Sequence, residues 1–162
     1  MTLHIRRAGA LDSGAMCDLL NEIIAIGGTT ALTAPMSRDA FQAKMEINAV
    51  HSAWHLAEDP TGEVLGFQWI APHPELPPKA CDIATFVRVG RTGLGTGSAL
   101  FDATRSAARA LGYRWINANI RADNSGGLAY YQSRGFEPYQ RLTGITLPNG
   151  QTVDKILKRY DL

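Results

Sequence analysis

Three glycines at alternate positions, Gly93, Gly95 and Gly97, separate a strand pattern from a long amphipathic helix pattern. The strand pattern covers Asp82 to Val89, and the helix pattern runs from about residue 97 to residue 111. Glycines let backbone amides approach a ligand with no Cβ in the way, and a helix start adds N–H groups and the positive end of a dipole. The segment therefore predicts a strand, loop and helix unit that binds phosphate through its backbone.

Two well-known phosphate-binding loops do not fit this segment. A P-loop needs Gly-x4-Gly-Lys-Ser/Thr, and no Lys follows these glycines. A dinucleotide-binding loop needs Gly-x-Gly-x-x-Gly or Ala, but the last place holds Ser98 or Leu100, and residues 113–119 lack the acidic residue that grips ribose. The pattern that remains is x-x-Gly-x-Gly within Thr92 to Gly97.

The other elements follow from alternation, caps and turn residues. We expect strands at 3–7, 51–58, 64–70, 82–89 and 114–120, helices from 13 to 26, after Ser37, from 97 to 111 and from Asn124 to Arg134, and two strands joined at 148–150. The order is βααβββαβαββ. Hairpins imply antiparallel pairing and the strand-helix-strand unit from 82 to 120 implies a parallel crossover, so the predicted sheet is mixed.

Composition limits the partners of the chain. The 162 residues carry a net charge of +1, which gives no bulk attraction to nucleic acid or to an anionic membrane, and their number suggests one domain over residues 1–162. The first residues have no signal-peptide core and no run is long enough for a membrane helix, so we expect a cytoplasmic protein. Cys17 and Cys81 lie far apart without metal-ligand spacing, which predicts buried thiols and no metal.

At the glycine loop the chain resembles the GNAT superfamily of acetyl-CoA-dependent N-acetyltransferases, whose pyrophosphate loop is Arg/Gln-x-x-Gly-x-Gly/Ala. Thr92 stands where the family usually has Arg or Gln, and Arg91, one place earlier, is the candidate to compensate. Downstream, Asn124-Ser-Gly-Gly-Leu-Ala-Tyr-Tyr131-Gln-Ser-Arg-Gly-Phe136 is similar to the family's Asn-x-x-Ala-x-x-x-Tyr-x-x-x-Gly-Phe, with Gly127 for the usual Ala. The element order also matches, so the resemblance covers nearly the whole chain. It implies a mostly antiparallel α/β sheet of about seven strands with four flanking helices.

The resemblance implies which residues hold acetyl-CoA, the expected co-substrate. The pyrophosphate would lie on the loop and helix start, Asn124 would touch the pantetheine arm, and the backbone near Phe86 and Val87 would place the thioester carbonyl. The loop residues are Thr92, Gly93, Leu94, Gly95, Thr96, Gly97 and Ser98.

The resemblance also implies direct transfer of the acetyl group, without a covalent enzyme intermediate. Tyr131 is the candidate acid that protonates the leaving thiolate, because a tyrosine keeps its proton at neutral pH. Asp82 is the candidate base for the amine, acting directly or through a water; the alternative is a structural role at the start of its strand. Among the family's members, phosphinothricin and methionine-sulfone acetyltransferases look closest, since Asp82 stands fifteen residues before Gly97 and matches their Glu.

The expected acceptor is a primary amine on a small amino-acid-like compound. Two alternatives remain open: a non-catalytic acyl-CoA sensor, and an acetyltransferase that acts on a protein amine. The last two strands are candidates for pairing across a two-fold axis in a homodimer.

Overall fold

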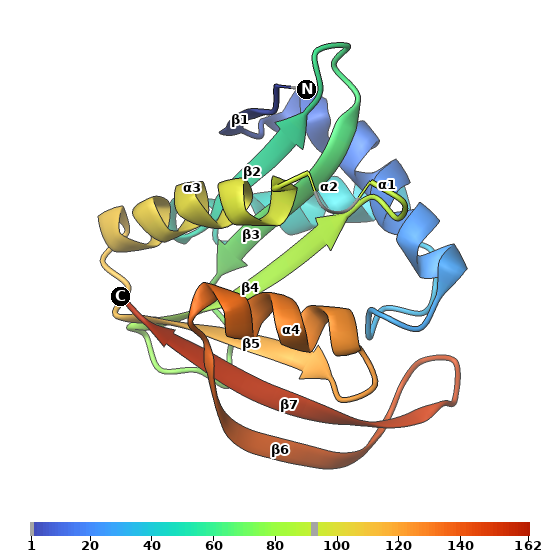
Figure 1. Cartoon of the computed structure of the whole chain (residues 1–162), viewed down its shortest axis with the longest axis vertical. Coiled ribbons are helices and arrows are strands. Elements are labelled where there is room, and N and C mark those ends of the chain that lie inside the picture. The colour runs from blue at the N-terminus through green and yellow to red at the C-terminus, as the bar shows by residue number, and fades with distance from the viewer. Residues whose placement is uncertain (1, 92–93) are drawn as a thin grey trace.

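A computed structural model of the chain describes residues 2–91 and 94–162. Within these ranges, one sheet of seven strands runs through the molecule in the order β1-β2-β3-β4-β5-β7-β6 (Figure 1). The strands are β1 (His4–Arg7), β2 (Ala53–Glu58), β3 (Val64–Ala71), β4 (Ala80–Val87), β5 (Trp115–Arg121), β6 (Glu137–Thr146) and β7 (Thr152–Asp161). Neighbouring strands are antiparallel except β4 and β5, which are parallel. The mixed, mostly antiparallel sheet is therefore confirmed.

Four α-helices cover the two faces of the sheet (Figure 1). Two of them, α3 (Thr96–Ala110) and α4 (Ser125–Arg134), lie on the front face in this view, and α1 (Ser13–Ile26) and α2 (Arg38–Glu46) lie behind. Local signals begin and end these helices. The Ser37 side chain accepts a hydrogen bond from the Ala40 amide at 3.1 Å, and Gly135, with φ of 102°, ends α4.

The predicted order of strands and α-helices is confirmed, with differences of detail. Two short 3₁₀ helices, η1 (Ala10–Asp12) and η2 (Ala49–His51), were not predicted. Strand β4 begins and ends two residues earlier than the predicted 82–89. After Arg88, whose amide still bonds to the Leu65 carbonyl at 2.8 Å, the chain turns away through Gly90, where φ is 84°.

Each face of the sheet has its own hydrophobic core. The core under α1 and α2 contains an aromatic group in which the Trp54 and Trp69 rings stack with centroids 4.2 Å apart. The core under α3 and α4 is built around Phe101 and Phe136, whose centroids are 5.5 Å apart. Cys17 and Cys81 are buried free thiols, one in each core, as predicted. Strand alternation therefore assigns every side chain of β4 and β5 to one of two distinct environments.

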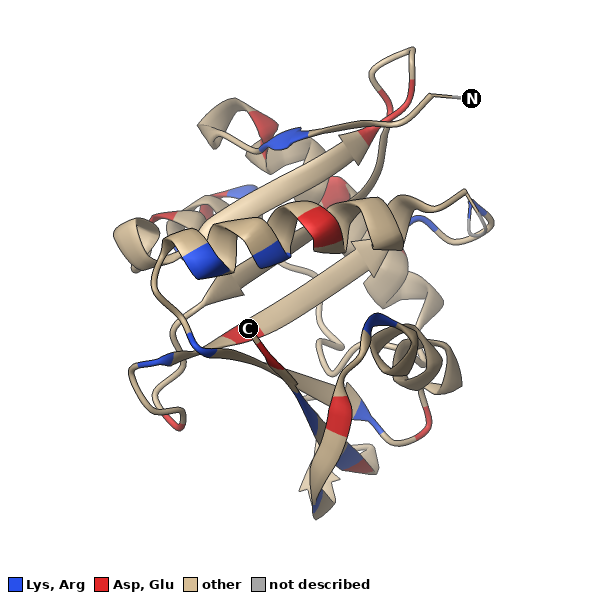
Figure 2. Cartoon of the chain, turned by 60° about the vertical axis from the view of Figure 1, so that its left-hand side comes forward, with Lys and Arg blue, Asp and Glu red and all other residues tan. Residues whose placement is uncertain are grey.

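Acidic and basic residues are interspersed over the described chain (Figure 2), consistent with its net charge of +1. Within the described ranges, each helix is too short or too polar to cross a lipid bilayer. Strands β1 and β6 form the two edges of the sheet. The pairing of the last strands across a two-fold axis stays a prediction.

Candidate active site

The parallel strands β4 and β5 diverge halfway along their length. They pair only from Ala80 to Ile83 on β4 and from Trp115 to Ala118 on β5. Beyond these points β4 pairs only with β3, and β5 pairs only with β7. The side chain of Asn119 is exposed although β5 is an internal strand of the sheet. The divergence thus leaves the facing edges of β4 and β5 without a strand partner beyond these points, and this gap between the two strands is called the opening below.

The strand register directs one backbone amide into this opening. The Arg88 amide bonds to the Leu65 carbonyl, and in an antiparallel ladder successive residues point their N–H groups alternately toward and away from the partner strand. The backbone groups of Phe86 therefore face β3, whereas the N–H of Val87 faces the side from which β5 has withdrawn. The Phe86 ring is buried in the aromatic group, 5.2 Å from the ring of Phe67. Of the two predicted backbone positions, Val87 has its donor available to a ligand.

The glycine loop leads into the first turn of α3. Gly95 is the N-cap residue of α3 and has a φ of 78°. Because it is a glycine, no side chain of the N-cap residue covers the first amides of the helix. The first backbone hydrogen bond of the helix runs from the Ala99 amide to the Gly95 carbonyl at 3.0 Å. The amides of residues 96–98 precede that bond and have no acceptor within the helix, which is the arrangement that binds anions. Leu94 is exposed beside them. Thr92 and Gly93 were also predicted to bind phosphate, but they lie outside the described residues.

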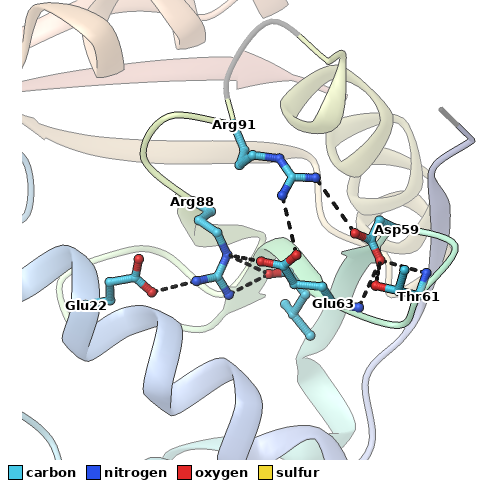
Figure 3. Close-up of polar contacts among 7 residues, drawn as sticks. Glu22, Asp59, Thr61, Glu63, Arg88 and Arg91 are labelled. Carbon is cyan, nitrogen blue, oxygen red and sulfur yellow. Dashed lines mark hydrogen bonds and ion pairs between the residues drawn. The ribbon is translucent and has the colours of Figure 1, made fainter.

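Two arginines anchor the segment between β4 and the loop (Figure 3). Arg88 donates to Glu22 of α1 at 2.6 Å and to the Val64 carbonyl of β3 at 2.8 Å. Arg91 forms ion pairs with Glu63, at 3.4 Å, and with Asp59, at 3.8 Å, in the hairpin between β2 and β3. The Arg91 guanidinium, proposed from sequence to replace the missing Arg or Gln at position 92, is thus turned toward the hairpin carboxylates.

Tyr131 reaches the opening from α4. Its side chain is buried, and its hydroxyl lies 2.8 Å from the hydroxyl of Thr85 on the diverging part of β4. Burial raises the pKa of Tyr131 well above its ordinary value, and the hydrogen bond with Thr85 lowers it in part. The hydroxyl is therefore protonated at neutral pH. The neighbouring Tyr130 instead donates to the Gly97 carbonyl at 2.7 Å and joins α4 to the first turn of α3.

Asp82 lies on the opposite face of the sheet from Thr85 and Tyr131. Its carboxylate accepts a hydrogen bond from the Asn117 side chain at 2.9 Å, and the Tyr139 hydroxyl donates to the other end of that amide. Burial raises the pKa of Asp82, and the Asn117 hydrogen bond lowers it in part. A carboxylate with a raised pKa is a stronger base than an exposed one, so the site has the chemistry to accept a proton.

Asn124 connects α4 to the loop that follows α1. Its side-chain oxygen accepts from the Gly127 amide at 3.0 Å, and its side-chain nitrogen donates to the Thr29 carbonyl at 3.1 Å. A Cβ at position 127 would lie 2.5 Å from that nitrogen. An Ala at position 127, as in the family's usual motif, would therefore push the Asn124 side chain out of this position.

This contact gives a stability prediction. Gly127→Ala is expected to have a free energy of unfolding about 1 kcal/mol below that of a neighbouring glycine-to-alanine change in the same helix, because the new methyl group displaces the Asn124 cap. The matched control is Gly126→Ala, where the nearest atom would be 3.8 Å away. That change should leave stability equal or raise it by up to about 1 kcal/mol, as Ala for Gly does in a helix. Urea unfolding of both variants measures the difference, and equal effects would contradict the assigned contact.

Four polar residues of the site carry no motif in the sequence. They are Gln68 of β3, Thr85 of β4, Asn117 of β5 and Tyr139 of β6. The signal available beforehand was a polar side chain within an otherwise apolar strand pattern, as at Gln68. Their partners could not be identified because they depend on strand register.

Surface hollows lie at two places on the described residues, and Tyr139 lines one of them. A concavity of about 450 Å³ lies between β6 and β7 and the end of α4, and one of about 250 Å³ lies between α2 and β2. Neither is lined by the diverging part of β4. In residues 2–91 and 94–162, no group of three His, Cys, Asp or Glu side chains has an arrangement that could hold a metal ion.

Comparison with known proteins assigns a family to this geometry. The family model described as "Acetyltransferase (GNAT) family" matches residues 20–136, and no match was found among curated proteins.

The fold is similar to three solved structures, each with a TM-score of 0.89. An N-acetyltransferase from Staphylococcus aureus Mu50 is 24% identical, with 99% of each chain covered. A phosphinothricin acetyltransferase from Sinorhizobium meliloti, in complex with acetyl-CoA, is 21% identical, with 100% of this chain and 89% of that chain covered. A ribosomal-protein-alanine N-acetyltransferase from Brucella melitensis is 21% identical, with 98% and 99% covered. The family model matches more than half of the chain, and the chain therefore belongs to the GNAT acetyltransferase family.

Proposed function

We propose that the chain transfers the acetyl group of acetyl-CoA directly to the primary amine of a small amino-acid-like acceptor. The observation that carries the proposal is the divergence of β4 and β5 after Ile83, with Asp82 just before it on one face of the sheet and Tyr131 beside it on the other face. An amine that enters beside Asp82 and a thiolate that leaves beside Tyr131 fit a single transfer step. Family membership supports the same chemistry.

The residues around the opening fit the parts of acetyl-CoA. The amides of residues 96–98 and the positive φ of Gly95 suit a diphosphate, and Asn124, which caps α4, would contact the pantetheine arm. The Val87 N–H faces the opening, where it would donate to the thioester oxygen. A donor placed in advance for a developing oxyanion is worth on the order of 3 kcal/mol. When bound, acetyl-CoA supplies the activated acetyl group.

Protons move at two atoms of the chain. The Asp82 carboxylate takes a proton from the acceptor ammonium or amine, directly or through a water, because only a neutral amine has a lone pair to attack with. The Tyr131 hydroxyl gives its proton to the sulfur as the C–S bond breaks. The Asn117 amide holds the Asp82 carboxylate in place through the 2.9 Å hydrogen bond.

Charges on the Asp82 face support an acceptor that carries a negative group. Lys155 of β7 is half-buried and lies opposite Arg121 of β5, so it shares the face of Asp82 and Asn117. Burial raises the pKa of Asp82, and the positive charge of Lys155 lowers it in part. Among the described residues, no hydrogen bond or ion pair engages the Lys155 ammonium. We therefore propose that Lys155 binds the carboxylate of the acceptor.

Lys155→Met is expected to raise the KM for a carboxylate-bearing amine about 10- to 100-fold, the range of one hydrogen bond to a charged group. The KM for the same amine without its carboxylate should stay within about 2-fold, because that acceptor makes no contact with the ammonium. Steady-state kinetics with such matched acceptors measure both values. An equal rise for both acceptors would contradict the role of Lys155.

The proposed function is tested by thiol release from acetyl-CoA over a panel of small amines, with the product identified by mass spectrometry. The expected result is turnover that saturates with a small amine. Saturable binding of acetyl-CoA without turnover on small amines or on peptide N-termini would overturn it in favour of a sensor. Turnover on peptides alone would overturn the small-acceptor assignment in favour of a protein acetyltransferase.

A further inference from the structure

We propose that Gln68 and Thr85 are positioning residues that turn the Tyr131 hydroxyl proton toward the leaving sulfur, through a one-way chain of hydrogen bonds. The proposal rests on the role of Tyr131 in the proposed function. It adds two residues for which the sequence carries no motif and which belong to strands β3 and β4 rather than to the loop or to α4.

The direction of these hydrogen bonds is set by Tyr130. Its hydroxyl donates to the Gly97 carbonyl at 2.7 Å, and since a carbonyl oxygen can only accept, the one proton of Tyr130 is used there. The Tyr130 oxygen must then accept from Gln68, whose side-chain nitrogen lies 3.1 Å away. This requirement fixes which end of the fully buried Gln68 amide faces the two tyrosines.

The Gln68 nitrogen has a second proton, which it donates to the Thr85 hydroxyl at 2.8 Å. Thr85 lies 2.8 Å from the Tyr131 hydroxyl. Because the Thr85 oxygen already accepts from Gln68, its own proton is available for Tyr131. Either hydroxyl can donate across this distance, and the proposed direction has Thr85 as the donor, so that the Tyr131 oxygen accepts and its own proton is left for another group.

No other described residue forms a hydrogen bond with the Tyr131 hydroxyl. In this direction the hydrogen bonds run from Gln68 to Thr85 to Tyr131. The Tyr131 proton is then free to be donated to a ligand in the opening beside β4. After Tyr131 has given its proton to sulfur, the Thr85 donor stabilises the tyrosinate that remains in a buried position. Burial alone would oppose that charge.

The Gln68 side-chain amide also connects Tyr131, the proposed acid, to α3, the helix that starts at the glycine loop. Tyr130 packs so closely on Gly97 that a Cβ there would lie 2.7 Å from its ring. The first turn of α3, Tyr130, Gln68 and Thr85 therefore form one continuous contact path to Tyr131. Gln68 is its branching point.

The test uses Thr85→Val, which keeps the shape of the side chain and removes the hydroxyl. We expect kcat to fall about 10- to 100-fold, the range of one hydrogen bond to a charged oxygen, with the KM for acetyl-CoA changed less than about 3-fold. Thr85→Ser, which restores the hydroxyl, should recover most of kcat. The matched control is Thr104→Val, because the Thr104 hydroxyl is buried on α3 without a hydrogen-bond partner and takes no part in this series of hydrogen bonds.

The decisive comparison is made in the Tyr131→Phe background. There Thr85→Val should lower kcat by less than about 2-fold, since its effect passes through the Tyr131 hydroxyl. A full additional loss in that background, no recovery with Ser, or an equal loss with Thr104→Val would overturn the proposal. Absence of wild-type turnover would instead refute the proposed function, so the two failures are distinguishable.

Discussion

Replacement of Tyr131 by Phe is expected to lower kcat by about 10²-fold or more, the loss that accompanies removal of a general acid. The hydroxyl is protonated at neutral pH because burial raises its pKa, and it is held by Thr85 at 2.8 Å beside the diverging strands. Without it, the sulfur must leave as an unprotonated thiolate. Steady-state release of free thiol with the best acceptor of the panel measures the change.

The control is Tyr113→Phe. Tyr113 is also a buried tyrosine, but its hydroxyl donates to the His51 carbonyl at 2.6 Å, outside the opening between β4 and β5. Both variants lose one buried hydrogen bond, so a general loss of stability would affect them alike. If kcat of the Tyr131 variant stayed within a few-fold of the Tyr113 variant, Tyr131 would not be the acid.

Replacement of Asp82 by Asn is expected to lower kcat/KM by at least about 10²-fold, as removal of a general base does. In the wild type the rate should rise with pH as Asp82 loses its proton, and the midpoint should lie above the ordinary pKa of an aspartate, because burial raises the pKa of this carboxyl. Activity is thus lost as the pH falls through that raised pKa. The Asn variant should lack this acidic limb.

The acidic side of the pH–rate profile could come from Asp82 or from the acceptor amine, and measuring it with two acceptors whose amines have different pKa values distinguishes the two sources. A limb that belongs to Asp82 keeps its position with both acceptors, whereas a limb that belongs to the acceptor amine moves. Asp154→Asn is the control, since Asp154 pairs with Arg141 on the exposed hairpin at 2.7 Å. An acidic limb that persists unchanged in the Asp82 variant would show that another group is the base.

Local chemistry explains why the fold could be predicted from the sequence. Ser37 and Asn124 cap helices through their own side chains, and Gly135 ends α4 with a positive φ, so each signal acts within a few residues. Motif spacing located Tyr131 and residues 94–98 in the same way, because each motif lies within one short segment of the sequence.

Contacts between distant segments could not be predicted in this way. Gln68 and Tyr130 are separated by 62 residues, and their hydrogen bond depends on the register of β3 and on the packing of α4. The ion pairs of Arg91 depend on hairpin carboxylates 28 or more residues away, so its adjacency to the loop was a poor guide to where its guanidinium lies. The choice of Val87 over Phe86 also required the strand register.

The central claim is that the opening between β4 and β5 and the first turn of α3 hold acetyl-CoA. Isothermal titration of acetyl-CoA into the folded protein at two temperatures tests this claim, because two temperatures reveal binding even where the heat is near zero at one of them. We predict saturable binding of one acetyl-CoA per chain at both. A flat titration at both temperatures, with the protein shown to be folded, would contradict the account.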